Sequence, residues 1–165
     1  KNLGFIGLPD FSWSFNGALI KSRVNFSGTT LMENRPMQGQ SPYLVNTGIF
    51  YKNEKLQLDA ALLYNRIGKR IIGVGRSEGT TSGNEALRVP DSYEMPRDVL
   101  DLSVSKKFGT HWEVKANIRD ILAQRVYYKE FVTATLNDGT TKKVEQITRS
   151  FKPGRNIGLS ITYKL

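Results

Sequence analysis

Apolar and polar residues alternate along most of this 165-residue chain, and this alternation restricts the fold more than any other feature. Side chains of a β-strand point to opposite faces in turn, so each alternating stretch is expected to be a strand with one apolar and one polar face. The stretches are residues 41–52, 56–65, 99–108, 112–119 and 156–165. The pattern predicts an all-β protein.

The stretch from residue 12 to residue 26 keeps the alternation less cleanly. Trp13 and Phe15 occupy one parity, whereas Val24 and Phe26 occupy the other. One extra residue in a strand shifts the parity of everything after it. We therefore predict a β-bulge near Gly17.

The connections between the expected strands alternate in length. Tight turns are expected at residues 8–10, 53–55 and 109–111, and long connections at 27–40, 73–92 and 131–145. Outer-membrane β-barrels have this asymmetry, with short periplasmic turns and long extracellular loops. The last long connection contains Asn137-Asp138-Gly139, which predicts a hairpin whose strands continue above the membrane.

Aromatic residues lie near both ends of the expected strands. Trp13 and Trp112 are close to tight turns, whereas Tyr43 and Tyr64 lie toward the long loops. From Tyr43 to Tyr51 a strand spans about 26 Å, or roughly 20 Å of membrane depth at a tilt of about 40°, near the ~25 Å apolar band of such barrels. A soluble sandwich or barrel has the same alternation with its apolar parity inward, so only the aromatic girdles and the loop asymmetry favour the membrane barrel.

Composition removes several classes of function. The chain has no cysteine and one histidine, His111, which excludes disulfides, thiolate zinc sites and multi-histidine metal sites. We expect His111 to be a turn residue and the protein to be no enzyme, with no cofactor and no metal. The net charge of +9 is spread in ones and twos among acidic residues, so we expect no nucleic-acid partner.

Several longer segments are similar to one protein family. They are residues 35–46 (RPMQGQSPYLVN), 62–71 (LLYNRIGKRI), 93–97 (YEMPR) with 100–103 (LDLS), and 117–122 (NIRDIL). These segments resemble, in order and spacing, the C-terminal strands of TonB-dependent outer-membrane receptors of the Bacteroidetes type, which carry a carboxypeptidase-regulatory-like domain at the N-terminus. The resemblance spans nearly the whole chain. The family usually ends in phenylalanine, whereas this chain ends in Leu165.

The resemblance implies a fold, a location and partners. Residues 1–165 are expected to form the C-terminal part of an outer-membrane β-barrel domain, an antiparallel up-and-down transmembrane segment of about seven strands from a 22-stranded barrel. The plug and the TonB box have no counterpart here. Expected partners are the remaining strands and the plug, in the same or another chain, the TonB system acting through that plug, outer-membrane lipid and lipopolysaccharide, and a surface lipoprotein or other complex partner.

A seven-stranded open sheet leaves two unpaired edges, which lipid does not tolerate, so we expect further strands to pair with it. The chain is accordingly expected to be a fragment or one part of a split barrel. In this arrangement the polar parity faces the lumen. We predict that Asp59, Asp101, Glu113, Lys115 and Arg119 contact the plug or the permeation path, a solvated wall being the alternative. Arg66 and Arg70 continue the lipid-facing parity beyond Tyr64, so we predict that they meet lipopolysaccharide phosphates, with ordinary loop arginines as the alternative.

Two functions from different classes remain. The first is a transporter, the barrel segment of a TonB-dependent receptor that imports a glycan, a peptide or a metal chelate across the cell outer membrane. The second is a structural barrel subunit of an outer-membrane assembly or secretion complex that transports nothing. A soluble ligand-binding barrel comes third. Ligand identity is not readable from this segment.

Overall fold

The computed structural model describes residues 2–26, 34–75, 89–135 and 139–165, and within these ranges it is built almost entirely of β-strands. A single turn of 3-10 helix, η1 (Gly4–Ile6), follows the first strand. No helix in the described part is long and apolar enough to cross a membrane. The strands are β1 (Asn2–Leu3), β2 (Leu8–Leu19), β3 (Tyr43–Asn53), β4 (Leu58–Ile67), β5 (Arg70–Gly73), β6 (Ser92–Glu94), β7 (Arg97–Phe108), β8 (Trp112–Arg119), β9 (Val126–Thr135), β10 (Thr141–Phe151) and β11 (Asn156–Tyr163).

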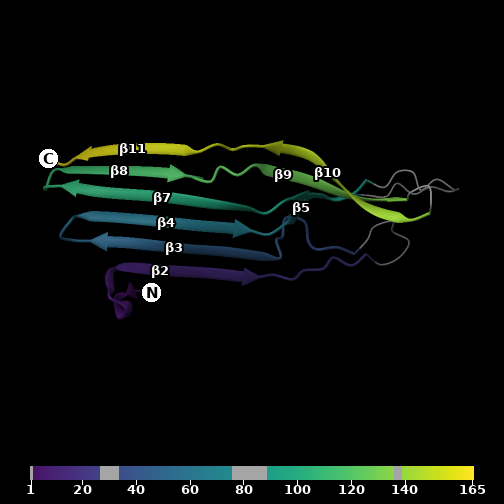
Figure 1. Ribbon diagram of the computed structural model, residues 1–165, viewed down its shortest axis with the longest axis horizontal. Helices are drawn as coiled ribbons and strands as arrows, with labels where there is room; N and C mark the ends of the chain where they lie inside the picture. Colours follow the sequence, from purple (N-terminus) through teal and green to yellow (C-terminus); the bar gives the residue numbers. More distant parts are fainter. Residues whose placement is uncertain (1, 27–33, 76–88, 136–138) are drawn as a thin grey trace.

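Seven of these strands form one antiparallel sheet, which we call the main sheet. Its order is β1-β2-β3-β4-β7-β8-β11, so each strand lies beside the one that precedes it in the chain among the strands of this sheet (Figure 1). This is the up-and-down arrangement and the strand number that the sequence predicts. The described strands leave the sheet open, since β11 pairs only with β8, and the closed barrel therefore stays a prediction.

The other four strands form an upper sheet of order β10-β9-β6-β5. Each of its strands continues one main-sheet strand: β5 follows β4, β6 precedes β7, β9 follows β8, and β10 precedes β11. The neighbour order is the same in both sheets. Four strands of the main sheet therefore end at one level, and each is followed in line by one strand of the upper sheet. We call this level the break; it comprises residues 68–69, 95–96, 120–125 and 152–155.

In the register of the main sheet, the apolar positions of neighbouring strands lie opposite one another and so face the same side of the sheet. Leu62 lies opposite Ile49 on one neighbour and Leu102 on the other, and Leu102 lies opposite Ile118. All six long strands follow this register, which makes one side of the sheet an apolar face. Its members include Trp13, Phe15, Leu19, Val45, Ile49, Tyr51, Leu62, Tyr64, Leu100, Leu102, Val104, Trp112, Val114, Ile118, Ile157, Leu159, Ile161 and Tyr163.

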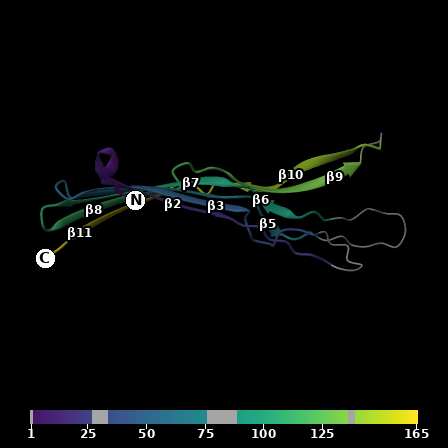
Figure 2. The ribbon, with the colours of Figure 1, turned by 90° about the horizontal axis from the view of Figure 1, so that it is seen from below.

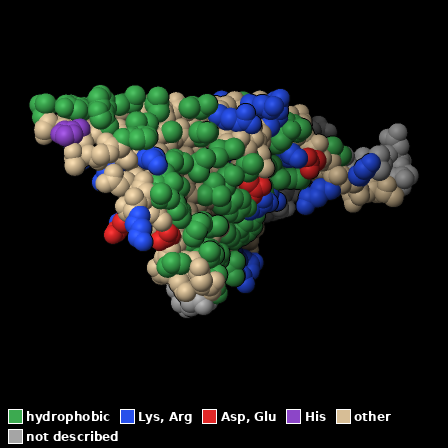
Figure 3. Space-filling view, turned by 60° about the vertical axis from the view of Figure 1, so that its left-hand side comes forward, with side chains coloured by type: hydrophobic (Ala, Val, Ile, Leu, Met, Phe, Trp, Pro, Cys, Tyr) green, Lys and Arg blue, Asp and Glu red, His purple; other side chains and the backbone are tan. Residues whose placement is uncertain are grey.

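The apolar face has no second layer over it in the described part of the chain. The main sheet is one strand thick when it is seen edge-on (Figure 2). Phe15 is 61%, Leu159 69% and Ile157 74% exposed, and only Ile71 and Val126 are buried hydrophobic residues among those described. Figure 3 shows hydrophobic side chains that form a continuous field over one side of the molecule. The sheet therefore lacks the core that a soluble β-sandwich builds between two layers.

Two local predictions from the sequence are wrong. β2 pairs with β3 in one register from Phe11 to Leu19, so there is no bulge at Gly17 and the parity change beyond it lies outside the strand. The expected turn at residues 8–10 belongs to β2; the chain turns earlier, at Gly7, whose φ of 83° suits glycine. The turns after β3 and β7 are confirmed at residues 54–57 and 109–111.

The hairpin predicted in the last long connection is confirmed. β9 and β10 pair from Val126 and Phe151 at one end to Thr135 and Thr141 at the other. Asn137 and Asp138 lie outside the described residues, whereas Gly139 has a φ of 81°, a backbone conformation that glycine adopts without strain. The hairpin extends beyond the main sheet at the end opposite the tight turns (Figure 1).

Candidate functional site

The side of the main sheet opposite the apolar face carries mostly polar and charged side chains, and we call it the polar face. The same register that aligns the apolar parities aligns these residues from strand to strand. The polar face includes Ser14, Asn16, Asn46, Asp59, Asn65, Asp101, Ser103, Ser105, Lys107, Glu113, Lys115, Asn117, Arg119, Asn156, Ser160 and Thr162. Charges placed in this way need water or a hydrogen-bonding partner against them.

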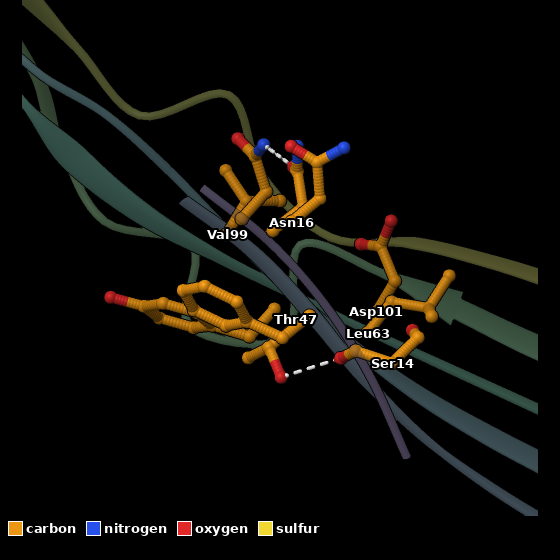
Figure 4. A pocket seen from close by; sticks show the side chains of 10 residues that line it. Ser14, Asn16, Thr47, Leu63, Val99 and Asp101 are labelled. Atoms are coloured by element: carbon orange, nitrogen blue, oxygen red, sulfur yellow. Dashed lines mark hydrogen bonds between the residues drawn. The ribbon is translucent and has the colours of Figure 1, made fainter. Parts of the chain in front are cut away.

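A shallow pocket of ≈ 290 Å³ lies across β2, β3, β4 and β7. Asn16, Asn46 and Asn65 lie in register on three neighbouring strands, and we call them the asparagine row. The Asn65 Nδ2 group donates to the side-chain Oδ1 of Asn46. Asp101 and Asn16 lie on one side of the strands in Figure 4, whereas Thr47 lies on the other and donates to the carbonyl of Ser14 at 2.9 Å. The lining also includes Phe15, Leu63, Tyr64 and Val99, so the pocket combines a few amides and one carboxylate with a mostly apolar wall.

The upper end of the polar face is held by a charged cluster at the break. Asp120 is buried, accepts from Arg97 Nη1 at 2.6 Å through Oδ2, and donates its backbone N–H to Asp101 Oδ1 at 2.8 Å. Its φ of 53° turns the chain out of β8, and the N–H of Ile121 then donates to Leu100 at 2.8 Å. The Asp120 Oδ1 atom is buried and has no hydrogen-bond partner among the described residues. We call Arg97, Asp101 and Asp120 the break cluster.

The five predicted lumen residues share the polar face but do not form one site. Asp101 lies at the level of the break cluster, and Arg119 ends β8 at the same level. Asp59 and Lys115 flank Ser105 farther down the sheet. Glu113 accepts from the Ser105 hydroxyl at 3.1 Å and lies 3.9 Å from Lys164 Nζ. Whether this face lines a lumen stays a prediction.

Both arginines predicted to face lipopolysaccharide pair with carboxylates of the chain. Arg66 lies at the upper end of the apolar face, 2.5 Å from Asp98 Oδ1, and Asp98 also accepts from the Tyr64 hydroxyl at 2.6 Å. Arg70 lies beyond the break, in β5, where it donates twice to Glu94 Oε2, at 2.7 and 3.0 Å. Binding of lipopolysaccharide by either residue stays a prediction, and it now requires a phosphate to compete with an existing partner.

Sequence reasoning missed the asparagine row and the break cluster. The row had a signal, since each asparagine occupies the polar parity of its strand, but only the register shows that the three are neighbours. The sequence signal for Asp120 was weaker. It lies in the 117–122 segment, and aspartate tolerates a positive φ better than most residues.

The described residues contain no group of three or more His, Cys, Asp and Glu side chains that could hold a metal ion. His111 lies in the turn between β7 and β8, where it stacks on Tyr163 with a centroid distance of 5.8 Å. No family model, curated protein or solved structure matches this chain.

Proposed function

We propose that this chain is part of the wall of an outer-membrane β-barrel, the C-terminal part of a TonB-dependent receptor that imports a nutrient. The observation that carries the proposal is the single-layer sheet, with an apolar face along six long strands and a polar face behind it. An apolar face of this size in water is unfavourable by roughly 25 cal/mol for each Å² exposed. Lipid on one side and an aqueous or plug-filled lumen on the other satisfy both faces.

The charged residues of the apolar face support the same orientation. Arg66 and Asp98 pair at its upper end, and Lys106 lies at its lower end, with its Nζ 5.7 Å from the centroid of the Phe108 ring. The rows between these ends carry no charge on this face. Charges on a lipid-facing surface cost roughly 2 to 4 kcal/mol at the bilayer midplane and about 0 to 1 near its boundaries, so this placement suits a membrane wall.

The segments that resemble the receptor family also contact one another. The Gly68 N–H donates to Tyr43 at 3.0 Å, and Arg66 bonds Asp98, a residue that directly follows the 93–97 segment. Arg97 bonds Asp120. Four segments separated in the sequence thus meet at the break, which supports their reading as parts of one structural unit.

Spin labels on neighbouring residues of β7 test the orientation. The chain has no cysteine, so Leu102→Cys and Ser103→Cys can each carry one nitroxide without further changes. In membranes we expect the residue 102 label to collide more with oxygen than with a water-soluble nickel chelate, because oxygen concentrates in lipid. The residue 103 label on the polar face is the matched control and should show no preference for oxygen. A residue 102 label shielded from both reagents would indicate a soluble core and would contradict the proposal.

The structural-subunit alternative predicts the same oxygen and nickel accessibilities for the two spin labels. A separate measurement distinguishes it from a transporter. We expect the intact protein to co-purify with a plug domain and to lose uptake when the energy-coupling system is removed. A barrel that carries no plug and remains bound to assembly or secretion proteins would favour the structural role.

A further inference from the structure

Aromatic and charged side chains share one side of the upper sheet. Residues two apart on a strand point the same way, so Lys129 and Phe131 of β9 share a side. Tyr93 lies opposite Lys129 and Glu145 lies opposite Phe131, which places both on that side as well. We call the whole group the aromatic–cationic patch; its members are Lys69, Tyr93, Arg125, Tyr127, Lys129, Phe131 and Glu145.

Lys69 lies over two rings of the patch. Its Nζ is 4.6 Å from the centroid of the Tyr93 ring and 4.9 Å from that of Phe131, and the two rings meet edge to face with centroids 5.6 Å apart. The rings attract the ammonium group, whose N–H donors can still bond an anion. Lys69 is exposed and has no carboxylate partner among the described residues, so its charge is available to a ligand.

The other half of the patch contains Lys129 and Arg125. Lys129 forms an ion pair with Glu145, and its Nζ lies 5.5 Å from the centroid of the Tyr127 ring. Arg125 is exposed and donates through Nη1 to Ser150 Oγ at 3.3 Å, and Ser150 lies opposite Tyr127. In the described part of the chain no carboxylate pairs with Arg125. Its guanidinium therefore keeps donors for a ligand.

The patch lies on the same side of the strands as the polar face. The Met95 N–H donates to the carbonyl of Tyr127 at 2.9 Å, and the Gly68 N–H donates to that of Tyr43 at 3.0 Å, so both short linkers of the break stay paired and extended. The alternation of sides therefore continues from β7 into β6 and from β4 into β5. In a membrane wall the patch borders the mouth of the lumen, where a solute arrives from outside.

The composition of the patch indicates the chemistry of its ligand. The three rings are half-buried and present part of their surface, which suits the C–H faces of sugar rings. The two cations without a carboxylate partner suit separate carboxylates, and the Glu145 carboxylate suits hydroxyl donors. Closely spaced phosphates, as in a nucleic acid, would be repelled by Glu145. An acidic sugar satisfies all three kinds of group.

We propose that the aromatic–cationic patch binds an oligosaccharide whose sugars carry carboxylates, and that Lys69 and Arg125 bind these carboxylates. The proposal rests on the membrane-wall function above, because only a barrel wall places the patch at the mouth of an import path. It narrows the imported nutrient to an acidic glycan.

Trigalacturonate and its fully methyl-esterified form test the need for charge on one sugar skeleton. The protein is purified from membranes in dodecyl maltoside with any partners that complete its barrel, and isothermal titration calorimetry gives the dissociation constants. We expect trigalacturonate to bind roughly tenfold more tightly than the ester, because charge-assisted hydrogen bonds are stronger than neutral ones. The variant Lys69→Gln/Arg125→Gln should lose this preference.

The control variant is Lys142→Gln/Arg149→Gln, which removes the same charge from exposed residues on the opposite side of the same sheet. It should keep the preference for trigalacturonate. An unchanged preference in the Lys69→Gln/Arg125→Gln variant, or an equal loss in the control, would overturn the site.

The sugar assignment has its own tests. Tyr127→Leu should weaken trigalacturonate binding roughly three- to tenfold, because a ring face is lost, and unchanged binding would contradict the role of the ring. Triglutamate carries carboxylates without a sugar ring, and we expect it to bind more weakly. Triglutamate or hexathymidylate binding as tightly as trigalacturonate would show a general site for anions and would overturn the assignment to an acidic glycan.

The spin-label experiment on β7 separates the two ways of failing. Oxygen access at residue 102 without a preference for trigalacturonate would reject the sugar site and leave the membrane wall standing. A shielded residue 102 would reject the membrane wall and, with it, the place of the patch at the mouth of an import path.

Discussion

Asp120 combines a strained backbone with a buried charge, and both affect how β8 ends. Its carboxylate bonds Arg97, and its φ is 53°. Asp120→Asn keeps a side chain that tolerates this φ and an oxygen that can accept a hydrogen bond, but it removes the negative charge that pairs with the Arg97 guanidinium. We expect it to lower the free energy of unfolding by about 1 to 3 kcal/mol. Asp120→Ala should cost roughly 1 kcal/mol more, since alanine disfavours a positive φ.

Urea unfolding in detergent, followed by tryptophan fluorescence, measures both changes. Asp59→Asn is the matched control, because Asp59 is an exposed carboxylate of the same face with no hydrogen bond or ion pair among the described residues. It should leave the midpoint unchanged. An equal loss in Asp59→Asn and Asp120→Asn would contradict the role given to the break cluster.

Arg66 and Asp98 should depend on each other because they meet on the apolar face. Asp98 also accepts hydrogen bonds from the Tyr64 hydroxyl and from the Gln124 side-chain amide. Arg66→Gln leaves the Asp98 carboxylate charged without its cation, and we expect it to lower the free energy of unfolding. Arg66→Gln combined with Asp98→Asn should recover part of this loss, because no unpaired charge remains. A double-mutant cycle by urea unfolding measures the coupling, and strictly additive effects would argue against the pair.

At the scale of the strand, the sequence predicts what is local. Alternation located the strands that begin near residues 43, 58, 97, 112 and 156, and short polar segments located the turns after β3 and β7. The bulge at Gly17 was a wrong interpretation of a parity change, because the strand ends at Leu19 and residues beyond it need not keep the pattern. Alternation of apolar and polar residues indicates a strand only where a neighbouring strand pairs with the chain and keeps it extended.

The break could not be predicted, because it depends on contacts between strands. β5 and β6 contain four and three residues, too few to show a period. Their positions follow from pairing, Arg70 with Glu94 and Tyr93 with Lys129. The break cluster is equally non-local, since Asp101 and Asp120 become neighbours only through the pairing of β7 with β8.

The β9–β10 hairpin should fold with little dependence on its outer half. Among the described residues, β10 pairs with β9 alone, and β6 pairs with β9 only from Tyr128 to Glu130. Deleting residues 132–144 and joining Phe131 to Glu145 through Asn-Gly should therefore leave the main sheet intact, because this turn suits a two-residue hairpin. Unheated gel mobility and urea stability should match the wild-type values.

A deletion in the main sheet is the control for this shortening. Removing residues 114–117 takes away part of β8, which pairs with both β7 and β11. We expect that variant to be degraded or to fail to reach the membrane. Equal damage from the two deletions would mean that the upper hairpin is as integral to the fold as the main sheet.

For the molecule as a whole, the sequence identified an apolar and a polar face, but it did not show what lies against each face. Alternation is the same whether the apolar parity faces lipid or a soluble core, and the structure adds that the described part of the chain supplies no second layer. The described residues do not show what pairs with the two edges of the sheet, at β1 and β11. The orientation of the wall is therefore argued from exposure and from where the charges lie.

The intact chain should need an amphiphile to remain dispersed. The apolar face is exposed, and no strand of the described part pairs with the outer edge of β11. We therefore expect the chain to aggregate in detergent-free buffer and to migrate as a defined particle in dodecyl maltoside. Size-exclusion chromatography with light scattering measures both states. A monodisperse monomer without detergent would contradict the membrane-wall proposal.

The break also affects which parts of such a protein can vary in sequence. The main-sheet strands β4, β7, β8 and β11 end at one level, and β5, β6, β9 and β10 form a separate sheet beyond it. The residues above that level therefore do not set the register of the main sheet. Substitutions, insertions or exchanges of the upper strands are then compatible with an unaltered wall, provided that Asp120 and its partners remain. The level of the break is where a chimaera between related chains should be joined.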